Sequence, residues 1–343
     1  MLNIFIIKSH NTDTFDQCIE SLTKNTVEKF SYKIVEEEEI REKTLNKIFS
    51  MVEDTDVIIA ADDIIFTHGW DTALKNNYKS NHISGFFMKS AVTDKVHNCG
   101  FDIISIDGSI ETSPILGVEE EKDDGSLIEC DTFTGCFMSI PKSVLKKINR
   151  VPIEGMNRIG ELIFHCLAKE AGFKVSVIAH YLKHFSSSTK RNPNQKLTNE
   201  SYIYERKIWD KAIKKFPIKN YVTKKYITEF SKKFNEIFQQ PTLVYGARSI
   251  CARLINQNKN NSSLSLCSGF KHEAGSIFLG HEIYHYKDID FSLYENILIT
   301  VKGRETAIIN DIEFLLEKKH KVFCIHEEIK SNLLKYQLKQ INV

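Results

Sequence analysis

The sequence has no excess of either charge, because 46 Lys and Arg residues stand against 45 Asp and Glu residues and leave a formal net charge of +1. This balance excludes a globally basic nucleic-acid binder, although it is compatible with local basic patches. Long hydrophobic runs are also missing: stretches such as IIAADDIIF contain charged residues well before the ~20 apolar residues that a membrane span needs. With 42% apolar and 27% charged residues, the composition is typical of a soluble globular protein.

The cysteines lack the spacing of a zinc site or a redox motif. None of the eight forms a CxxC pair, and Cys18, Cys136, Cys166 and Cys251 lie within apolar patterns. We therefore expect reduced core cysteines. The N-terminus, MLNIFIIKSH, has the pattern of a buried strand and lacks the basic start and cleavage site of a signal peptide. Together these features predict a cytoplasmic protein.

Strand and helix patterns alternate over the first 110 or so residues. LNIFII, YKIV and DVIIA are predicted strands, and residues 13–25 and 41–52 are predicted amphipathic helices between them. This β-α-β-α-β order predicts an α/β fold with a mostly parallel sheet, whose ligands bind at the carboxyl ends of the strands. Asp62 and Asp63 follow the third predicted strand directly, at such an end.

Composition divides the chain into three parts. We predict a first domain over residues 1–197, a basic helical linker over 198–240 and a small Rossmann-like α/β domain over 241–343. Residues 190–238 contain thirteen Lys or Arg against five Asp or Glu. This surplus is either a solvated helical face or a patch that attracts an anionic acceptor, such as a phospholipid-linked glycan, or the inner face of a membrane. The C-terminal domain is a candidate homodimer contact.

An acidic pair at the end of a buried strand indicates a cation site. Asp62 and Asp63 would be costly to bury without a compensating charge, and hard cations such as Mg²⁺ or Mn²⁺ take oxygen ligands and sometimes an imidazole. Adjacent acids are also common in turns, and that reading stays open. Transfer from a nucleoside diphosphate sugar would need such a cation for the leaving diphosphate, and a separate carboxylate to take the acceptor proton.

The stretch DTDVIIAADDIIFTHGWDTAL resembles the inverting glycosyltransferase family 2, particularly its bacterial rhamnosyltransferase-like members, which have the GT-A fold. Asn46 lies seventeen residues before Asp63, as in the family's "N-x-G, gap, strand, N/D-D-D" phrase, and HGW stands where the family has Pro-Gly-Trp. VHNCGFDIISIDGSI, CDTFTGCFMSIPKSVLKKI and RIGELIFHCLAKEAGFKVSVIA resemble its later segments, so the resemblance covers roughly residues 1–210. Ala61 departs from the pattern, because an acid or amide is expected there.

The resemblance implies a metal pair and a catalytic base. Asp63 corresponds to the metal-binding end of the acidic motif, and His184, twelve residues past Gly172, corresponds to the second metal ligand. Counting back from Gly172 aligns Glu161 with the acid that deprotonates the acceptor hydroxyl, while Gly160 replaces the acid before it. The alternatives are an ordinary carboxylate in the first turn of a helix and a structural histidine at a strand end.

Donor recognition is expected from the ends of the first strands. The resemblance implies contacts to the nucleotide donor from Ser9, Glu36, Asn46 and Asp62. The resulting expectation is an inverting, metal-dependent glycosyltransferase that uses Mn²⁺ or Mg²⁺, a nucleoside diphosphate sugar donor and a glycan or lipid-linked glycan acceptor, in bacterial surface-polysaccharide synthesis.

Two other functions compete with this expectation. Ala61 and Gly160, which depart from the family pattern, favour a non-catalytic GT-A-like protein that binds a nucleotide sugar or a glycan. The segment VYGARSICARLI resembles the opening of Rossmann-like domains. The second competing function is therefore that of a nicotinamide-dependent oxidoreductase. Only Gly246 of the dinucleotide fingerprint is present there, which argues against bound NAD.

Overall fold

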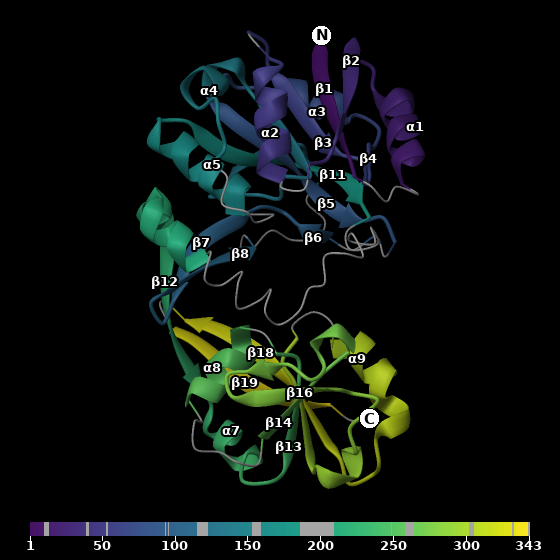
Figure 1. The fold of residues 1–343 in the computed structure, drawn as a ribbon, viewed down its shortest axis with the longest axis vertical. Helices are drawn as coiled ribbons and strands as arrows, with labels where there is room; N and C mark the ends of the chain where they lie inside the picture. Colours follow the sequence, from purple (N-terminus) through teal and green to yellow (C-terminus); the bar gives the residue numbers. More distant parts are fainter. Residues whose placement is uncertain are drawn as a thin grey trace. The chain divides into compact units, whose positions relative to one another are not determined.

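A computed structural model of the chain describes residues 1–9, 14–38, 41–52, 54–92, 94, 96–114, 123–152, 159–185, 209–247, 249–257, 264–269, 271–301, 305–330 and 333–341. The chain forms two compact units, the first made of Met1–Gln195 and Glu205–Lys224, the second of Lys196–Tyr204 and Lys225–Val343 (Figure 1).

The first unit is built on a mostly parallel sheet with strand order β2-β1-β3-β10-β5-β11-β4. Strands β2, β1, β3, β5 and β11 run in one direction, and β10 runs antiparallel between β3 and β5. Short strands β6 and β9 pair with β5 and β11. The strands are β1 (Leu2–Lys8), β2 (Phe30–Glu36), β3 (Val57–Ala61), β4 (Ile64–Ile65), β5 (His82–Ser90), β6 (Val96–Asn98), β9 (Leu127–Glu129), β10 (Phe137–Ile140) and β11 (Lys174–His184).

Helices cover both faces of this sheet. They are α1 (Phe15–Asn25), α2 (Arg41–Ser50), α3 (Trp70–Asn77), α4 (Lys142–Lys147) and α5 (Ile159–Glu170). Alternate residues of β1 point to opposite faces: Ile4 and Ile6 pack with side chains of α1 and α3, whereas Phe5 and Ile7 pack with side chains of α2, α4 and α5. Because both faces of the sheet are covered, its strands have continuous apolar sequences, as β1 does.

A hairpin and a C-terminal extension complete the first unit. Strands β7 (Phe101–Ile106) and β8 (Ser109–Pro114) form the hairpin that the Asp107-Gly108 turn predicts, with positive φ at both turn residues. A helix over residues 209–215 and the 3₁₀ helix η1 (Pro217–Tyr221) contribute Ala212, Ile213 and Ile218 to a small core with the hairpin and α5.

The predicted helical linker over residues 198–240 is therefore wrong in part. Residues 198–208 lie outside the described residues, and residues 209–221 are helical but pack into the first unit. Val222–Phe230 forms strand β12, which pairs in parallel with β19, and only α7 (Lys232–Ile237) is helical after it. Alternation of Tyr226 and Thr228 (buried) with exposed Lys225 and Ile227 gives this segment the period of a strand, which its lysine content hid.

The second unit has a sheet with the order β15-β16-β14-β13-β17-β18-β19-β12. Strands β16, β14, β13, β17 and β18 are parallel, as in a Rossmann-like domain. Its further elements are β13 (Thr242–Tyr245), α8 (Ser249–Gln257), β14 (Leu264–Ser268), η2 (Lys271–Glu273), β15 (Ile277–Phe278), β16 (His281–His285), η3 (Phe291–Leu293), β17 (Asn296–Ile299), α9 (Glu305–Ile312), η4 (Glu313–Leu315), β18 (Lys321–Lys330) and β19 (Leu333–Ile341).

The α/β fold class predicted from the sequence is confirmed in both units. Gly246 has φ +104°, and a Cβ there would lie 2.3 Å from Val301 Cγ2, so this glycine allows the turn after β13 to pass close to β17. None of the eight cysteines forms a disulfide and seven are buried, as expected for core residues. No helix in the described part of the chain is both long enough and apolar enough to span a membrane.

Candidate active site at the carboxyl edge of the first sheet

The parallel strands of the first unit bring several predicted site residues to one edge of its sheet. Ser9 follows β1, Glu36 and Glu37 end β2, and Asp62 follows β3. Strand β11 runs in the same direction and ends at His184, and the antiparallel β10 begins at this edge just after Gly135. The edge is therefore where residues far apart in the sequence meet.

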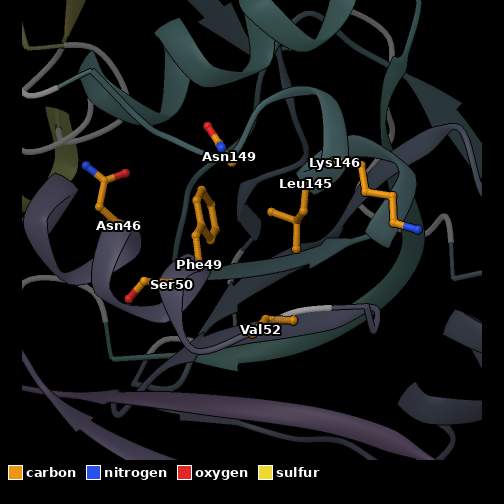
Figure 2. A pocket seen from close by; sticks show the side chains of 7 residues that line it. All are labelled: Asn46, Phe49, Ser50, Val52, Leu145, Lys146 and Asn149. Atoms are coloured by element: carbon orange, nitrogen blue, oxygen red, sulfur yellow. The ribbon is translucent and has the colours of Figure 1, made fainter.

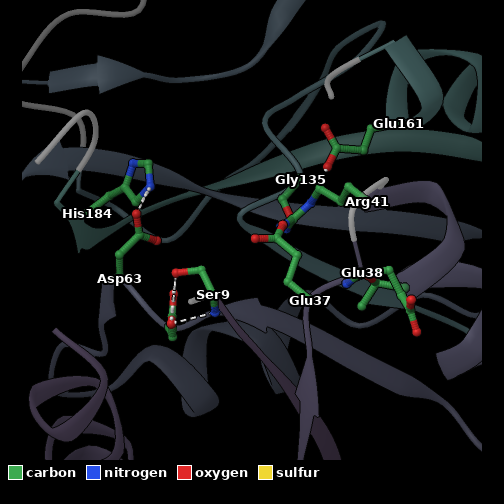
Figure 3. Close-up of polar contacts among 10 residues, drawn as sticks. Ser9, Glu37, Glu38, Arg41, Asp63, Gly135, Glu161 and His184 are labelled. Atoms are coloured by element: carbon green, nitrogen blue, oxygen red, sulfur yellow. Dashed lines mark hydrogen bonds and ion pairs between the residues drawn. The ribbon is translucent and has the colours of Figure 1, made fainter. Parts of the chain in front are cut away.

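Asp63 and His184 lie side by side because of backbone register. Strand β4, directly after Asp63, pairs antiparallel with the end of β11, with His184 opposite Ile64. The Phe185 N–H donates to the Asp63 carbonyl at 3.0 Å. His184 Nε2 lies 3.2 Å from Asp63 Oδ2 (Figure 3). The other carboxylate oxygen, Asp63 Oδ1, is buried and has no hydrogen-bond partner among the residues that the structure describes.

Asp62 points the other way and holds the loop after β1. Its Oδ2 accepts a hydrogen bond from the Ser9 N–H at 2.8 Å, and the Ser9 hydroxyl lies 3.2 and 3.3 Å from its two oxygens. Burial raises the pKa of Asp62 to about 6; the Asp63 charge adds to this rise, and the Ser9 N–H opposes it. Asp62 and Ser9 thus contact each other directly, as two predicted donor-binding residues.

Glu161 is held by a buried arginine that the sequence analysis did not find. Glu161 lies in the first turn of α5 and is only 7% exposed. The Arg41 Nε donates to Glu161 Oε1 at 2.9 Å, and Arg41 Nη2 donates to the Gly135 carbonyl at 2.9 Å (Figure 3). A Cβ on Gly135 would lie 1.9 Å from Glu161 Oε1, so the glycine leaves the space in which this carboxylate sits.

Arg41 also joins Glu37 to this group. Its Nη1 donates to Glu37 Oε1 at 3.2 Å, from one turn earlier in the chain. Burial lowers the pKa of Arg41, but the Glu161 and Glu37 carboxylates hold it above its ordinary value. One guanidinium therefore balances two carboxylates. The spacing of Glu37 and Arg41, i and i+4, is the sequence signal that could have found it.

Glu42, the next residue of α2, is a second side chain that the sequence analysis missed. It is 2% exposed, and neither of its carboxylate oxygens has a hydrogen-bond partner of good geometry. Burial raises its pKa to about 7, and the Glu161 charge adds to the rise, although the N–H groups of Glu42 and Gly160 lower it. Glu42 shares a face with Leu45 and Phe49, and an acid on the apolar stripe of a helix is a visible signal.

Asn46 is not brought to this edge. Its side-chain N–H donates to the Val151 carbonyl at 2.9 Å, and its Oδ1 accepts from the Val151 N–H at 2.7 Å. Both polar groups of the Asn46 side chain are therefore hydrogen-bonded to the backbone of Val151. Asn46 also lines a pocket between α2 and α4 of about 390 Å³, with Phe49, Ser50, Val52, Leu145, Lys146 and Asn149 (Figure 2). None of the predicted metal or base residues lines this pocket.

Glu36 is at the edge but faces solvent. Its side chain is 62% exposed and lies 4.0 Å from Lys8 Nζ. Two further histidines of the first unit have other partners. His180 contacts Asp123 and Thr67, and the fully buried His165 contacts Thr132. Burial lowers the pKa of His165 to about 3, so this side chain is a neutral core residue.

The site therefore consists of two neighbouring groups, Asp62, Asp63 and His184 in one and Glu37, Arg41 and Glu161 in the other (Figure 3). Both groups act on Cys136: burial raises the pKa of its thiol to about 12, and both Asp63 and Glu161 add to that rise. Among the described residues, no group of three or more His, Cys, Asp or Glu side chains could hold a metal ion. A cation here would rest on two protein ligands.

No protein-family model and no curated protein matches the chain. Solved structures similar to it include A197 from STIV (15% identity, 52% of this chain and 81% of that one, TM-score 0.31). A second is S. aureus TarS 1-349, with 12% identity over 54% of this chain and 60% of that one, and a TM-score of 0.34. A third is the inositol-1-phosphate CTP transferase from T. maritima, with 14% identity over 61% of this chain and 96% of that one, and a TM-score of 0.32. The chain thus spans 60% of the TarS structure.

The contacts of Asn46 predict a structural effect of its removal. We expect Asn46→Ala to lower the free energy of unfolding by roughly 1–3 kcal/mol, because two hydrogen bonds to the Val151 backbone are lost. Urea denaturation measures this, with Ser50→Ala, at an exposed position of the same helix, as the control. Unchanged stability together with weakened nucleotide binding would instead support the donor contact that the resemblance implies.

The burial of Glu42 predicts a pH-dependent stability. Its pKa is about 7 in the native state and 4.5 ordinarily, so between these values the native state keeps a proton that the unfolded state releases. Stability is therefore lost as pH rises through this window. Relative to wild type, Glu42→Gln should gain roughly 1–3 kcal/mol between pH 4.5 and pH 8. Urea denaturation at both pH values tests this, with Glu20→Gln, exposed on α1, as control; a difference that does not change with pH would contradict it.

Proposed function

We propose that the protein is an inverting, metal-dependent glycosyltransferase that moves a sugar from a nucleoside diphosphate sugar to a hydroxyl of a glycan or lipid-linked glycan. The observation that carries this proposal is the meeting, at one edge of an α/β sheet, of the Asp63–His184 pair with a separate carboxylate, Glu161. Such a transfer requires these two functions together: compensation of charge on the leaving diphosphate, and a base for the acceptor hydroxyl.

A divalent cation fits the Asp63–His184 pair. Asp63 Oδ1 is a buried oxygen without a partner, and Asp63 Oδ2 and His184 Nε2 lie 3.2 Å apart, close enough for both to contact one ion. When bound, Mn²⁺ or Mg²⁺ would neutralise the charge that develops on the departing diphosphate. Two protein ligands suit an ion of this kind, because Mg²⁺ usually keeps several waters and takes phosphate oxygens from its substrate.

Glu161 is proposed as the general base. Arg41 contacts its Oε1 and fixes the carboxylate in one orientation, while Oε2 is left to accept the proton of the acceptor hydroxyl. The hydroxyl oxygen then forms a bond to the anomeric carbon from the face opposite the diphosphate, and the bond from that carbon to the diphosphate oxygen breaks with inversion.

Donor binding is assigned to the ends of β1 and β2. Ser9 and Asp62, held together by hydrogen bonds, would shape the loop that meets the nucleotide, and Glu36 offers an exposed carboxylate for ribose hydroxyls. The C-terminal unit and the basic residues between 190 and 238 would serve assembly or the acceptor, including a peripheral membrane contact.

The proposal predicts hydrolysis of a nucleoside diphosphate sugar by the wild-type protein in the presence of Mn²⁺, because glycosyltransferases release their diphosphate slowly to water as the acceptor. We expect Glu161→Gln and Asp63→Ala to lower the rate by about 10²-fold or more. A coupled diphosphate-release assay over a panel of donors measures it. Asp54→Asn and His68→Ala, at exposed positions, are controls expected to keep the wild-type rate.

A non-catalytic protein that binds a nucleotide sugar is the second candidate. The Arg41 contact to Glu161 and the small number of metal-ligating side chains among the described residues favour it. Calorimetry would show Mn²⁺-dependent binding of a nucleoside diphosphate in both cases. Binding without any release of diphosphate, with every donor and acceptor tried, would decide for this second candidate.

A further inference from the structure

The buried carboxyl of Glu42 is not used by the chemistry proposed above. It lies on α2 beside Arg41, faces the first turn of α5 and is 2% exposed, yet neither oxygen has a hydrogen-bond partner of good geometry. A carboxyl group in such a place is costly, because burial penalises its ionised form. A buried acid without a partner is uncommon enough to ask what it does there.

Gly160 leaves the space that Glu42 fills. A Cβ on Gly160 would lie 2.3 Å from Glu42 Cγ and 2.6 Å from Glu42 Oε1. Any side chain at position 160 would therefore collide with this carboxylate. Two consecutive residues of α5, Gly160 and Glu161, thus meet two consecutive residues of α2, Glu42 and Arg41.

The positive charge nearest to Glu42, that of Arg41, is paired with other acids. Arg41 donates its hydrogen bonds to Glu161, Glu37 and the Gly135 carbonyl, and none of them goes to Glu42. The groups that act on Glu42 are the Glu161 charge and the Gly160 N–H from α5, and Arg41 and its own N–H from α2. Burial disfavours the ionised form of Glu42 and raises its pKa to about 7, and the like charge of Glu161, which is paired with Arg41, adds to this rise.

We infer that Glu42 is a positioning residue for Glu161: the two carboxyls form a coupled pair in which Glu42 holds a proton at low pH and, once ionised, strengthens Glu161 as the acceptor of the hydroxyl proton. This rests on the function proposed above. Glu42 does not touch substrate and gains no proton in the reaction. It acts through its charge, which repels that of Glu161 and so favours transfer of the acceptor proton to Glu161.

The activity test is a pH–rate profile at saturating Mn²⁺ and donor. In the wild type, kcat for diphosphate release should rise by roughly three- to tenfold between pH 6 and pH 8. Glu42→Gln, which is neutral at every pH, should lack this rise and stay near the low-pH rate, with KM for the donor within about twofold of wild type. Glu38→Gln, an exposed acid paired with Lys47, is the matched control and should keep the wild-type profile. A Glu42→Gln profile that superimposes on that of wild type would overturn the inference.

A second measurement needs neither turnover nor a change at Glu42. In protein labelled with ¹³C at the glutamate carboxyls, the Glu42 resonance should titrate near neutral pH in wild type and move to lower pH in Glu161→Gln, because the repelling charge is gone. If this shift appears but no donor is ever turned over, the coupled pair stands and the proposed function fails. If the Glu42 titration is the same in both proteins, the two carboxyls are not coupled and the inference fails, whatever the activity.

Discussion

The first unit depends on one constraint: four carboxylic acids are buried near one edge of its sheet, and their charges must be compensated. Asp62, Asp63, Glu42 and Glu161 are each less than 9% exposed, and Arg41 is the cation that contacts one of them directly. Buried charges persist in proteins when they are paired, hydrogen-bonded, protonated or bound to a metal. Each acid at this edge is compensated differently. Asp62 accepts from Ser9, Glu161 pairs with Arg41, and Glu42 has its pKa raised to about 7.

Asp63 is compensated at only one of its two oxygens. His184 contacts one oxygen, and the other is buried without a partner. Under the proposed function, this oxygen would be a ligand position for the cation. The same constraint explains two glycines: Gly135 and Gly160 give room to Glu161 and Glu42. The backbone of the sheet and the first turns of α2 and α5 thus define where each charge sits.

Much of this arrangement was predictable from the sequence. The alternation of strands and helices predicts the parallel strands β1, β2 and β3, and hence the place of Asp62 and Asp63 at their carboxyl edge. The meeting of Asp63 with His184 was expected only from a family resemblance. Its structural cause is the pairing of β4 with β11, and a two-residue strand gives no periodic signal. The roles of these residues in binding and catalysis remain predictions.

Other features escaped because they depend on packing between distant segments. Arg41 and Glu42 look like surface charges of an amphipathic helix until α5 is placed against α2. Asn46 fits a motif by spacing, yet its amide is used by the backbone of Val151, more than a hundred residues later. In the second unit, the parallel strands β14, β13, β17 and β18 agree with the predicted Rossmann-like domain. The hairpin of β18 and β19 was missed, because charged residues on its exposed face mask the strand period.

The most direct test of the central claim is Mn²⁺ binding, followed by electron paramagnetic resonance of the free ion, with a nucleoside diphosphate such as UDP present. The account predicts saturable binding by the wild type and binding weaker by about tenfold or more in both Asp63→Asn and His184→Ala. His68→Ala, which changes an exposed imidazole near the same turn, should bind as the wild type does. Equal Mn²⁺ affinity in all four proteins would contradict the account, because Asp63 and His184 would then not be ligands of the ion.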